Sequence, residues 1–183
     1  MTLGQLFTLE QQSLRRRIPI IGREKGAWLL QKVKELQPKI ILELGTANGY
    51  SGCILGSQGA KLLTIEINHA MAEEAAINFS RYGINAKIVL GEGTTIIKEL
   101  VAEKQLFDLI FIDFAKKEYL PVLEGCLLLV KTGGVIIADN ISMAKCQNFK
   151  AAVLHHHKLR TEIINIGDGL SYSIKLGDGF IQK

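Results

Sequence analysis

Cysteine, proline and long apolar runs are scarce in this chain of 183 residues, which has three cysteines and three prolines. Cys53, Cys126 and Cys146 are an odd number and none lies in a C-x-x-C pair. The sequence therefore predicts neither a disulfide framework nor a zinc site, and is typical of a reducing compartment. No apolar run approaches the roughly 18 residues that a membrane-spanning helix needs. The N-terminus lacks the basic-then-apolar order of a signal peptide, so we expect a cytoplasmic protein without a membrane partner.

Positive charge is concentrated near the N-terminus. Residues 1–39 hold eight Lys or Arg against three Asp or Glu, while the net charge of the whole chain is only +4. A basic segment such as Arg15–Arg17 can contact nucleic acid or another polyanion. The alternative is a solvated helix face, so tRNA stays open as a partner at this point.

Short β-rich runs alternate with helical segments after two amphipathic helices, expected over 4–16 and 25–37. Five expected strands are followed by a helix and two further β-rich runs, RTEIINIG and LSYSIKL, which flank the hairpin signal Asp168-Gly169. The five strands are expected at 39–44, 61–67, 86–91, 107–113 and 134–139. This order predicts an α/β fold with a doubly wound, mostly parallel seven-stranded sheet that ends in an antiparallel hairpin. The length predicts a single domain over 1–183, with N-terminal helices over 1–38 and the core over 39–183.

A glycine-rich loop follows the first expected strand, in ELGTANGYSG. A dinucleotide fingerprint would need G-x-G-x-x-G, and its second glycine falls on Ala47; no Gly-Lys-Ser/Thr ending of a P-loop is present. Glu66 ends the second strand 21 residues after Gly45, where an acid can accept hydrogen bonds from a ribose diol. Glu43 ends an otherwise buried strand, so it should have a cationic or hydrogen-bonding partner. The spacing predicts a nucleoside-containing cofactor.

Three oxygen-bearing side chains follow the fourth and fifth strands. Asp113 ends the fourth, and Asp139 and Asn140 end the fifth. Because these strands are neighbours in the expected topology, the three should meet beside the glycine loop. Two carboxylates and an amide suit Mg²⁺ or another divalent cation; the alternative is that the aspartates cap the helices that follow.

Four motifs in order, ILELGTANGYS, LTIEIN, FDLIFIDFAKKEYL and GGVIIADN, resemble the cation-dependent, catechol-type O-methyltransferases. The upstream IPIIGREKGAWL and the downstream DGLSYSIK extend the resemblance. Members of this family use S-adenosylmethionine (SAM) and have a Rossmann-like fold, so the resemblance implies both here.

The resemblance also implies roles for single residues. Lys116, in the D-x-x-K pattern that starts at Asp113, would be the general base, and the adjacent Lys117 should point to solvent. The metal ligands would be Asp113, Asp139 and Asn140. The cofactor-binding residues would be Ile21, Glu43, Gly45, Tyr50, Ser51, Glu66, Glu92 and Asp113.

The expected activity is transfer of a methyl group from SAM to one hydroxyl of a small vicinal-diol or catechol-like acceptor chelated to the cation. The alternatives are a tRNA hydroxyuridine O-methyltransferase of the same fold and a non-catalytic SAM-binding protein. Glu162 falls near a position where some relatives bind the second substrate hydroxyl. The short segment after Asn140 implies a small or open acceptor pocket, and uncovered apolar surface predicts a homodimer.

Overall fold

The computed structural model of the chain describes residues 1–177. One seven-stranded sheet has the order β3-β2-β1-β4-β5-β7-β6. The first five strands run parallel, and β7 pairs antiparallel with both β5 and β6. The strands are β1 (Ile40–Leu44), β2 (Lys61–Glu66), β3 (Ala86–Leu90), β4 (Phe107–Ile112), β5 (Val130–Asp139), β6 (Leu159–Ile164) and β7 (Leu170–Lys175). The predicted fold class is confirmed.

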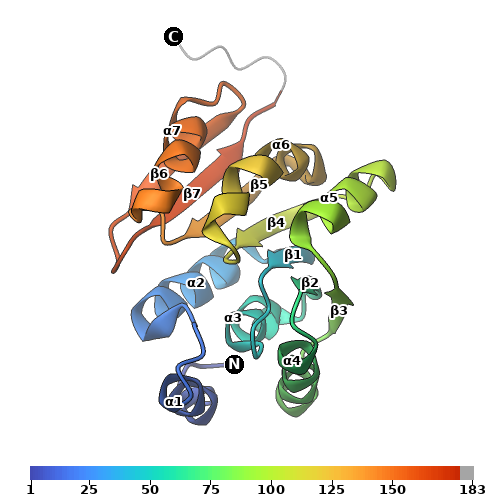
Figure 1. Ribbon diagram of the computed structural model, residues 1–183, viewed down its shortest axis with the longest axis vertical. Coiled ribbons are helices and arrows are strands. Elements are labelled where there is room, and N and C mark those ends of the chain that lie inside the picture. Colours follow the sequence, from blue (N-terminus) through green and yellow to red (C-terminus); the bar gives the residue numbers. More distant parts are fainter. Residues whose placement is uncertain (178–183) are drawn as a thin grey trace.

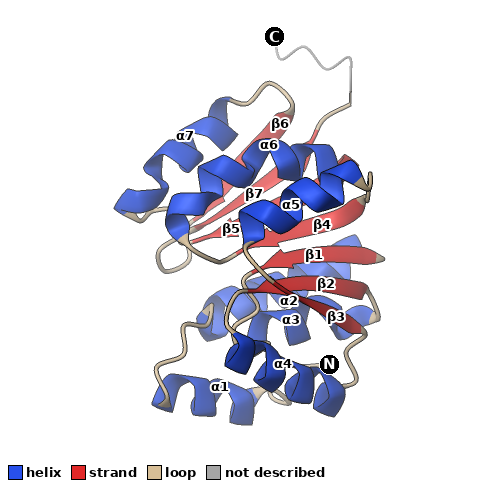
Figure 2. Ribbon diagram, turned by 45° about the vertical axis from the view of Figure 1, so that its right-hand side comes forward, coloured by secondary structure: helices blue, strands red, loops and turns tan. Residues whose placement is uncertain are grey.

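Helices cover both faces of the sheet (Figures 1 and 2). On one face lie α5, α6 and α7, and on the other α2, α3 and α4, with α1 packed at the outer side of that second layer. The helices are α1 (Phe7–Arg15), α2 (Gly22–Leu36), α3 (Tyr50–Leu55), α4 (His69–Tyr82), α5 (Gly93–Ala102), α6 (Tyr119–Leu129) and α7 (Gln147–His155). None of these described helices is both long and apolar enough to cross a membrane.

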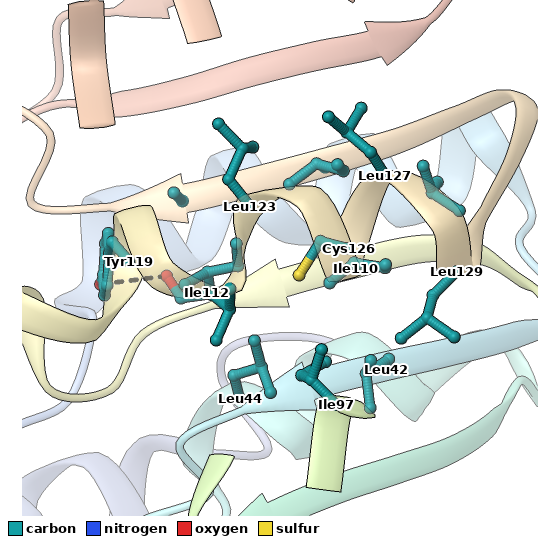
Figure 3. Packing of buried hydrophobic residues seen from close by; sticks show 14 of the residues in the cluster. Leu42, Leu44, Ile97, Ile110, Ile112, Tyr119, Leu123, Cys126, Leu127 and Leu129 are labelled. Carbon is teal, nitrogen blue, oxygen red and sulfur yellow. Dashed lines mark hydrogen bonds between the residues drawn. The ribbon is translucent and has the colours of Figure 1, made fainter. Parts of the chain in front are cut away.

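The core consists of apolar side chains from the strands and from the helices on both faces of the sheet. Figure 3 shows Leu123, Cys126 and Leu127 of α6 in one buried cluster with residues of β1 and β4, and Cys126 lies next to Ile110 of β4. Tyr119 begins α6 and is fully buried, and its hydroxyl donates to the carbonyl of Ile112 at 3.1 Å. All three cysteines are free and buried.

Two element boundaries differ from the sequence prediction. Helix α2 begins at Gly22 rather than at residue 25, and it ends at Leu36 because Gln37 adopts a left-handed conformation (φ 45°) before Pro38. Strand β5 begins at Val130 rather than at residue 134, and its register against β4 shifts between Phe107 and Leu109. The carboxyl ends of the strands, where the site lies, are predicted within one residue.

Candidate active site

A cavity of about 670 Å³ opens at the carboxyl ends of β1, β2 and β4. The strand order reverses between β1 and β4, which is where open α/β sheets bind their ligands. Residues 17–19, before α2, form one wall. Five of the predicted site residues line the cavity: Gly45, Glu66, Glu92, Asp113 and Lys116.

The glycine loop is shaped by close backbone contact. Gly45 has φ +98°, and a Cβ atom there would lie 2.1 Å from the carbonyl oxygen of Asp113. Only glycine fits both conditions. Ala47 also has a positive φ, of 45°. The position that would be the second glycine of a dinucleotide fingerprint therefore keeps a glycine-like conformation although it holds alanine.

Glu66 lies at the cavity with its carboxylate oriented by the backbone. Oε2 accepts from the amide of Ala47 at 2.8 Å, and Oε1 accepts from the amides of Ile67 and Asn68 at 3.0 and 2.8 Å. A carboxylate has about four acceptor positions, so Oε2 keeps capacity for a further donor. This arrangement fits the predicted contact with ribose hydroxyls.

Glu43 is fully buried and does not line the cavity. Its two oxygens accept hydrogen bonds from Ser51 Oγ and Thr64 Oγ1, each at 2.6 Å. The sequence predicted that this acid needs a partner, and hydroxyls rather than cations provide it. Burial raises the pKa of Glu43 to about 8, against the lowering effect of the two hydroxyls. Glu43 therefore favours its protonated form at neutral pH in the folded protein.

The other residues predicted to bind the methionine part of SAM lie beneath the cavity or beside it. Tyr50 and Ser51 are buried at the start of α3, and Ile21 is buried just before α2. The Tyr50 hydroxyl has no hydrogen-bond partner among the described residues. None of the three is part of the cavity lining, so their contacts with a cofactor stay predictions.

Glu92 and Glu162, the two outlying candidates, differ in position. Glu92 lines the cavity just before α5, where its Oε2 accepts from Thr95 Oγ1 at 3.2 Å. Glu162 is exposed on β6 opposite Tyr172 and does not line the cavity.

Lys116 is held at the cavity by two partners. Its Nζ donates to Asp113 Oδ1 at 2.7 Å and to the Tyr119 hydroxyl at 2.9 Å. The Lys116 side chain is 19% exposed, whereas that of Lys117 is 81% exposed. The expected outward direction of Lys117 is confirmed.

Asp113 directly follows β4 and Asp139 ends the neighbouring strand β5, where Ile112 pairs with Ala138 in the parallel register. Asp139 Oδ1 accepts from the backbone amide of Asn140 at 2.7 Å and from Lys25 Nζ. Burial, followed by the nearby charge of Asp113, raises the pKa of Asp139 despite the contact with Lys25. The two carboxylates therefore lie close enough to repel each other, which an added cation would relieve.

The donor set at this point fits a hard divalent cation. Asp113 Oδ2, Asp139 Oδ2 and Asn140 Oδ1 receive no hydrogen bond from any described residue, whereas the other polar side-chain atom of each is engaged. Within residues 1–177 there is no group of three or more His, Cys, Asp or Glu side chains placed to hold a metal ion. A cation here would thus need the amide oxygen of Asn140, as octahedral oxygen coordination allows.

Sequence reasoning missed two charged residues at this site, Lys25 and Asp168. Lys25 Nζ contacts Asp139 Oδ1 and Asp168 Oδ1, and Asn140 Nδ2 donates to Asp168 Oδ2 at 2.5 Å. A signal for Lys25 existed, because it lies four and eight residues before Leu29 and Val33 on the buried face of α2. Asp168 had only its place in the hairpin turn to indicate it.

Comparison with known proteins finds relatives over most of the chain. The family model described as O-methyltransferase matches residues 3–176. Catechol O-methyltransferase B of Danio rerio is 35% identical over 175 residues, and catechol O-methyltransferase of Sus scrofa is 32% identical over 176. These matches cover 86% and 87% of this chain, and they span 66% of the fish protein and 94% of the pig protein.

Solved structures give the same assignment of fold. A candidate caffeoyl-CoA O-methyltransferase from Staphylococcus aureus superposes with a TM-score of 0.84 at 26% identity, over 93% of this chain and 91% of that one. The O-methyltransferase of Bacillus cereus, solved with SAH, also gives 0.84, at 23% identity and over 94% and 90% of the two chains. The family match covers nearly the whole described chain, and the chain therefore belongs to the O-methyltransferase family.

Proposed function

We propose that this chain transfers the methyl group of SAM to one of two adjacent hydroxyls on a small catechol-like acceptor, with the aid of a divalent cation. The observation that carries the proposal is the set of three unengaged oxygens, on Asp113, Asp139 and Asn140, next to Lys116 and the 670 Å³ cavity. A bound cation at these oxygens would favour ionisation of a chelated hydroxyl. Mg²⁺ suits the donor set, because it prefers oxygen ligands and keeps positions open for water or substrate.

Other side chains of this chain would bind the cofactor and accept the proton of the acceptor hydroxyl. Gly45, Glu66 and Glu92 border the cavity, and we assign them to the cofactor, with Glu66 accepting from the ribose hydroxyls. Lys116 Nζ would accept the proton that the acceptor hydroxyl loses. The oxygen would then bond to the methyl carbon of SAM as the carbon–sulfur bond breaks, so that SAH would be the other product. Because Tyr119 and Asp113 fix Lys116 Nζ, its contribution is both positional and acid–base.

A small acceptor is favoured over tRNA because part of the basic segment Arg15–Arg17 is already bound within the protein. Arg16 forms a two-point ion pair with Glu74 at 2.6 and 2.8 Å, so one of the three consecutive arginines is already engaged. Binding of tRNA that weakens steeply with salt, together with methylation of tRNA, would instead favour the alternative.

The homodimer remains a further proposal. Leu120 and Leu128 on α6 are 43% and 63% exposed, and an apolar helix face of this kind can be covered by a second copy. A monomeric mass by light scattering at micromolar concentration would contradict it.

The proposed activity is tested by a screen of methyl acceptors with labelled SAM, with and without EDTA. We expect turnover of a simple catechol that EDTA abolishes and Mg²⁺ restores. Labelled SAM that binds but is never turned over, with any acceptor or cation, would favour a non-catalytic SAM-binding protein.

A further inference from the structure

Lys25 is a charged residue in a buried position that none of the roles above uses. Its side chain is 7% exposed on the inner face of α2. An ammonium group is costly to bury unless it is paired, and Nζ contacts two carboxylates, those of Asp139 and Asp168. Lys25 thus links α2 to the end of β5 and to the turn between β6 and β7.

Asp168 completes a closed ring of contacts around the end of β5. One of its oxygens contacts Lys25, and the other accepts from Asn140 Nδ2 at 2.5 Å. Asp139 Oδ1 contacts Lys25 and accepts from the Asn140 amide. The ring therefore runs Lys25–Asp139–Asn140–Asp168 and back to Lys25, and it engages one side of each of the two residues at the end of β5.

The backbone fixes the turn that carries Asp168. The amide of Ser142 donates to the Asp168 carbonyl at 2.9 Å, and the amide of Ile141 donates to the Gly169 carbonyl at 3.1 Å. A Cβ atom on Gly169 would lie 2.8 Å from Ser142 Oγ, so the two segments approach closely. Asp168 is 44% exposed, yet its place relative to Asn140 is set by these contacts.

The consequence is the orientation of two side chains. With Nδ2 bound to Asp168, the amide of Asn140 must direct Oδ1 the other way. With Oδ1 bound to Lys25, Asp139 keeps Oδ2 available. Asn140 also has φ 57°, a left-handed conformation that asparagine tolerates better than most residues. Neither orientation depends on a bound ligand.

We propose that Lys25 and Asp168 are positioning residues, which orient Asp139 and Asn140 so that one oxygen of each faces a divalent cation. This inference rests on the proposed function, because it assumes that a cation binds there. Partners that orient metal ligands typically change metal affinity 10- to 100-fold when they are mutated. If these ion pairs were only structural, mutating them would lower the stability of the fold without a specific loss of metal affinity.

Asp108 supplies a matched control at the opposite end of the sheet. It accepts from Lys131 Nζ at 2.6 Å and from the amides of Lys39 and Ile40 at 2.8 and 2.9 Å. It is thus also an aspartate shared by a lysine and other donors, but it lies away from the cavity. Asp108→Ala should lower the melting temperature and leave metal affinity unchanged.

The experiment measures Mn²⁺ affinity by EPR and SAH affinity by calorimetry on the full chain, at a temperature where circular dichroism shows each variant folded. Lys25→Met and Asp168→Ala should raise the Kd for Mn²⁺ 10- to 100-fold and leave the Kd for SAH within twofold. Asp168→Asn keeps an acceptor oxygen for Asn140, so its loss should be smaller than that of Asp168→Ala. If Lys25→Met does not fold, the two Asp168 variants decide, because that side chain is partly exposed.

Each outcome has one meaning. Folded Asp168→Ala with unchanged Mn²⁺ affinity overturns the positioning role and leaves the proposed function standing. Equal losses of SAH and Mn²⁺ affinity also overturn it, since they indicate general disruption of the site. Wild-type protein that binds no Mn²⁺ at all would overturn the cation in the proposed function and this inference with it.

Discussion

The site has two parts that are assembled in different ways. We call the residues assigned to SAM (Gly45, Glu66 and Glu92) the cofactor half, and those assigned to the cation (Asp113, Asp139 and Asn140, with Lys25 and Asp168) the cation half. The cofactor half comes from residues within the span 45–92, where Glu66 is oriented by backbone amides of residues 47, 67 and 68. The cation half comes from segments far apart in the chain, with Lys25 reaching partners 114 and 143 residues away. The first half depends on local backbone geometry and the second on the completed tertiary fold, so the two should respond separately to mutation.

Removal of the proposed general base should give the largest effect on turnover. Lys116→Met keeps the side-chain volume and should lower kcat roughly 10²–10⁴-fold, while SAH binding stays near wild type. Lys116→Arg should do no better, because a guanidinium stays protonated. Lys117→Met, at an 81% exposed side chain, is the control and should cost little. Full kcat in both Lys116 variants on a confirmed acceptor would leave Lys116 without a catalytic role.

Gly45→Ala should be the one change that damages both halves. Its Cβ would lie 2.1 Å from the carbonyl oxygen of Asp113 at a φ of +98°, so strain and a backbone clash act together. We expect a loss of roughly 3 kcal/mol or more of unfolding free energy, measured by denaturant titration. Gly59→Ala is the matched control, with φ +84° and no atom within 4 Å, and should cost only the left-handed strain of about 1–2 kcal/mol. Equal losses in the two variants would show that the contact with Asp113 is unimportant.

Glu66→Ala should affect the cofactor half alone. Unpaired ribose hydroxyls should weaken SAM binding by about 1–3 kcal/mol, as measured by calorimetry. The Kd for Mn²⁺ should stay within twofold of wild type. Glu73→Ala on α4, whose side chain is 68% exposed, should change neither affinity. Unchanged SAM affinity in Glu66→Ala would show that the ribose contact is assigned to the wrong residue.

Glu43 should make the free energy of unfolding depend on pH. Its pKa rises from an ordinary value of 4.5 to about 8 on folding, chiefly through burial, so the folded state keeps a proton that the unfolded state loses. The Glu43 contribution to stability is therefore complete below pH 4.5 and is lost as the pH rises toward 8, by about 1 kcal/mol per pH unit. Glu43→Gln should flatten that slope in denaturant titrations at pH 5.5, 6.5 and 7.5. Parallel slopes in the two proteins would mean that Glu43 ionises normally.

The sequence indicated the cofactor half more fully than the cation half. Gly45 follows the first strand and Glu66 ends the second, so their spacing in the sequence was enough to predict that they lie at the same edge of the sheet. Asp113, Asp139 and Asn140 could be placed together because parallel strands end at a common edge. The predicted strand order and the terminal hairpin are confirmed on the same grounds.

The long-range contacts could not be predicted from local patterns. The apolar periodicity of α2 cannot predict that Lys25 contacts Asp168 in the turn between β6 and β7. That contact depends on how α2 packs against the hairpin. Glu43 shows the same limit in another form. Its strand-end position is readable, but its burial against Ser51 and Thr64 rather than at the cavity depends on the packing of α3.

The most direct test of this account is a pair of measurements on wild-type protein in excess EDTA, SAM affinity by calorimetry and methyl transfer to a catechol acceptor. If the two halves are separate, the Kd for SAM should stay within twofold of its value with Mg²⁺, while turnover disappears and returns when Mg²⁺ is restored. Full turnover in EDTA would contradict the role proposed for Asp113, Asp139 and Asn140. Loss of SAM binding in EDTA would contradict the separation of the two halves.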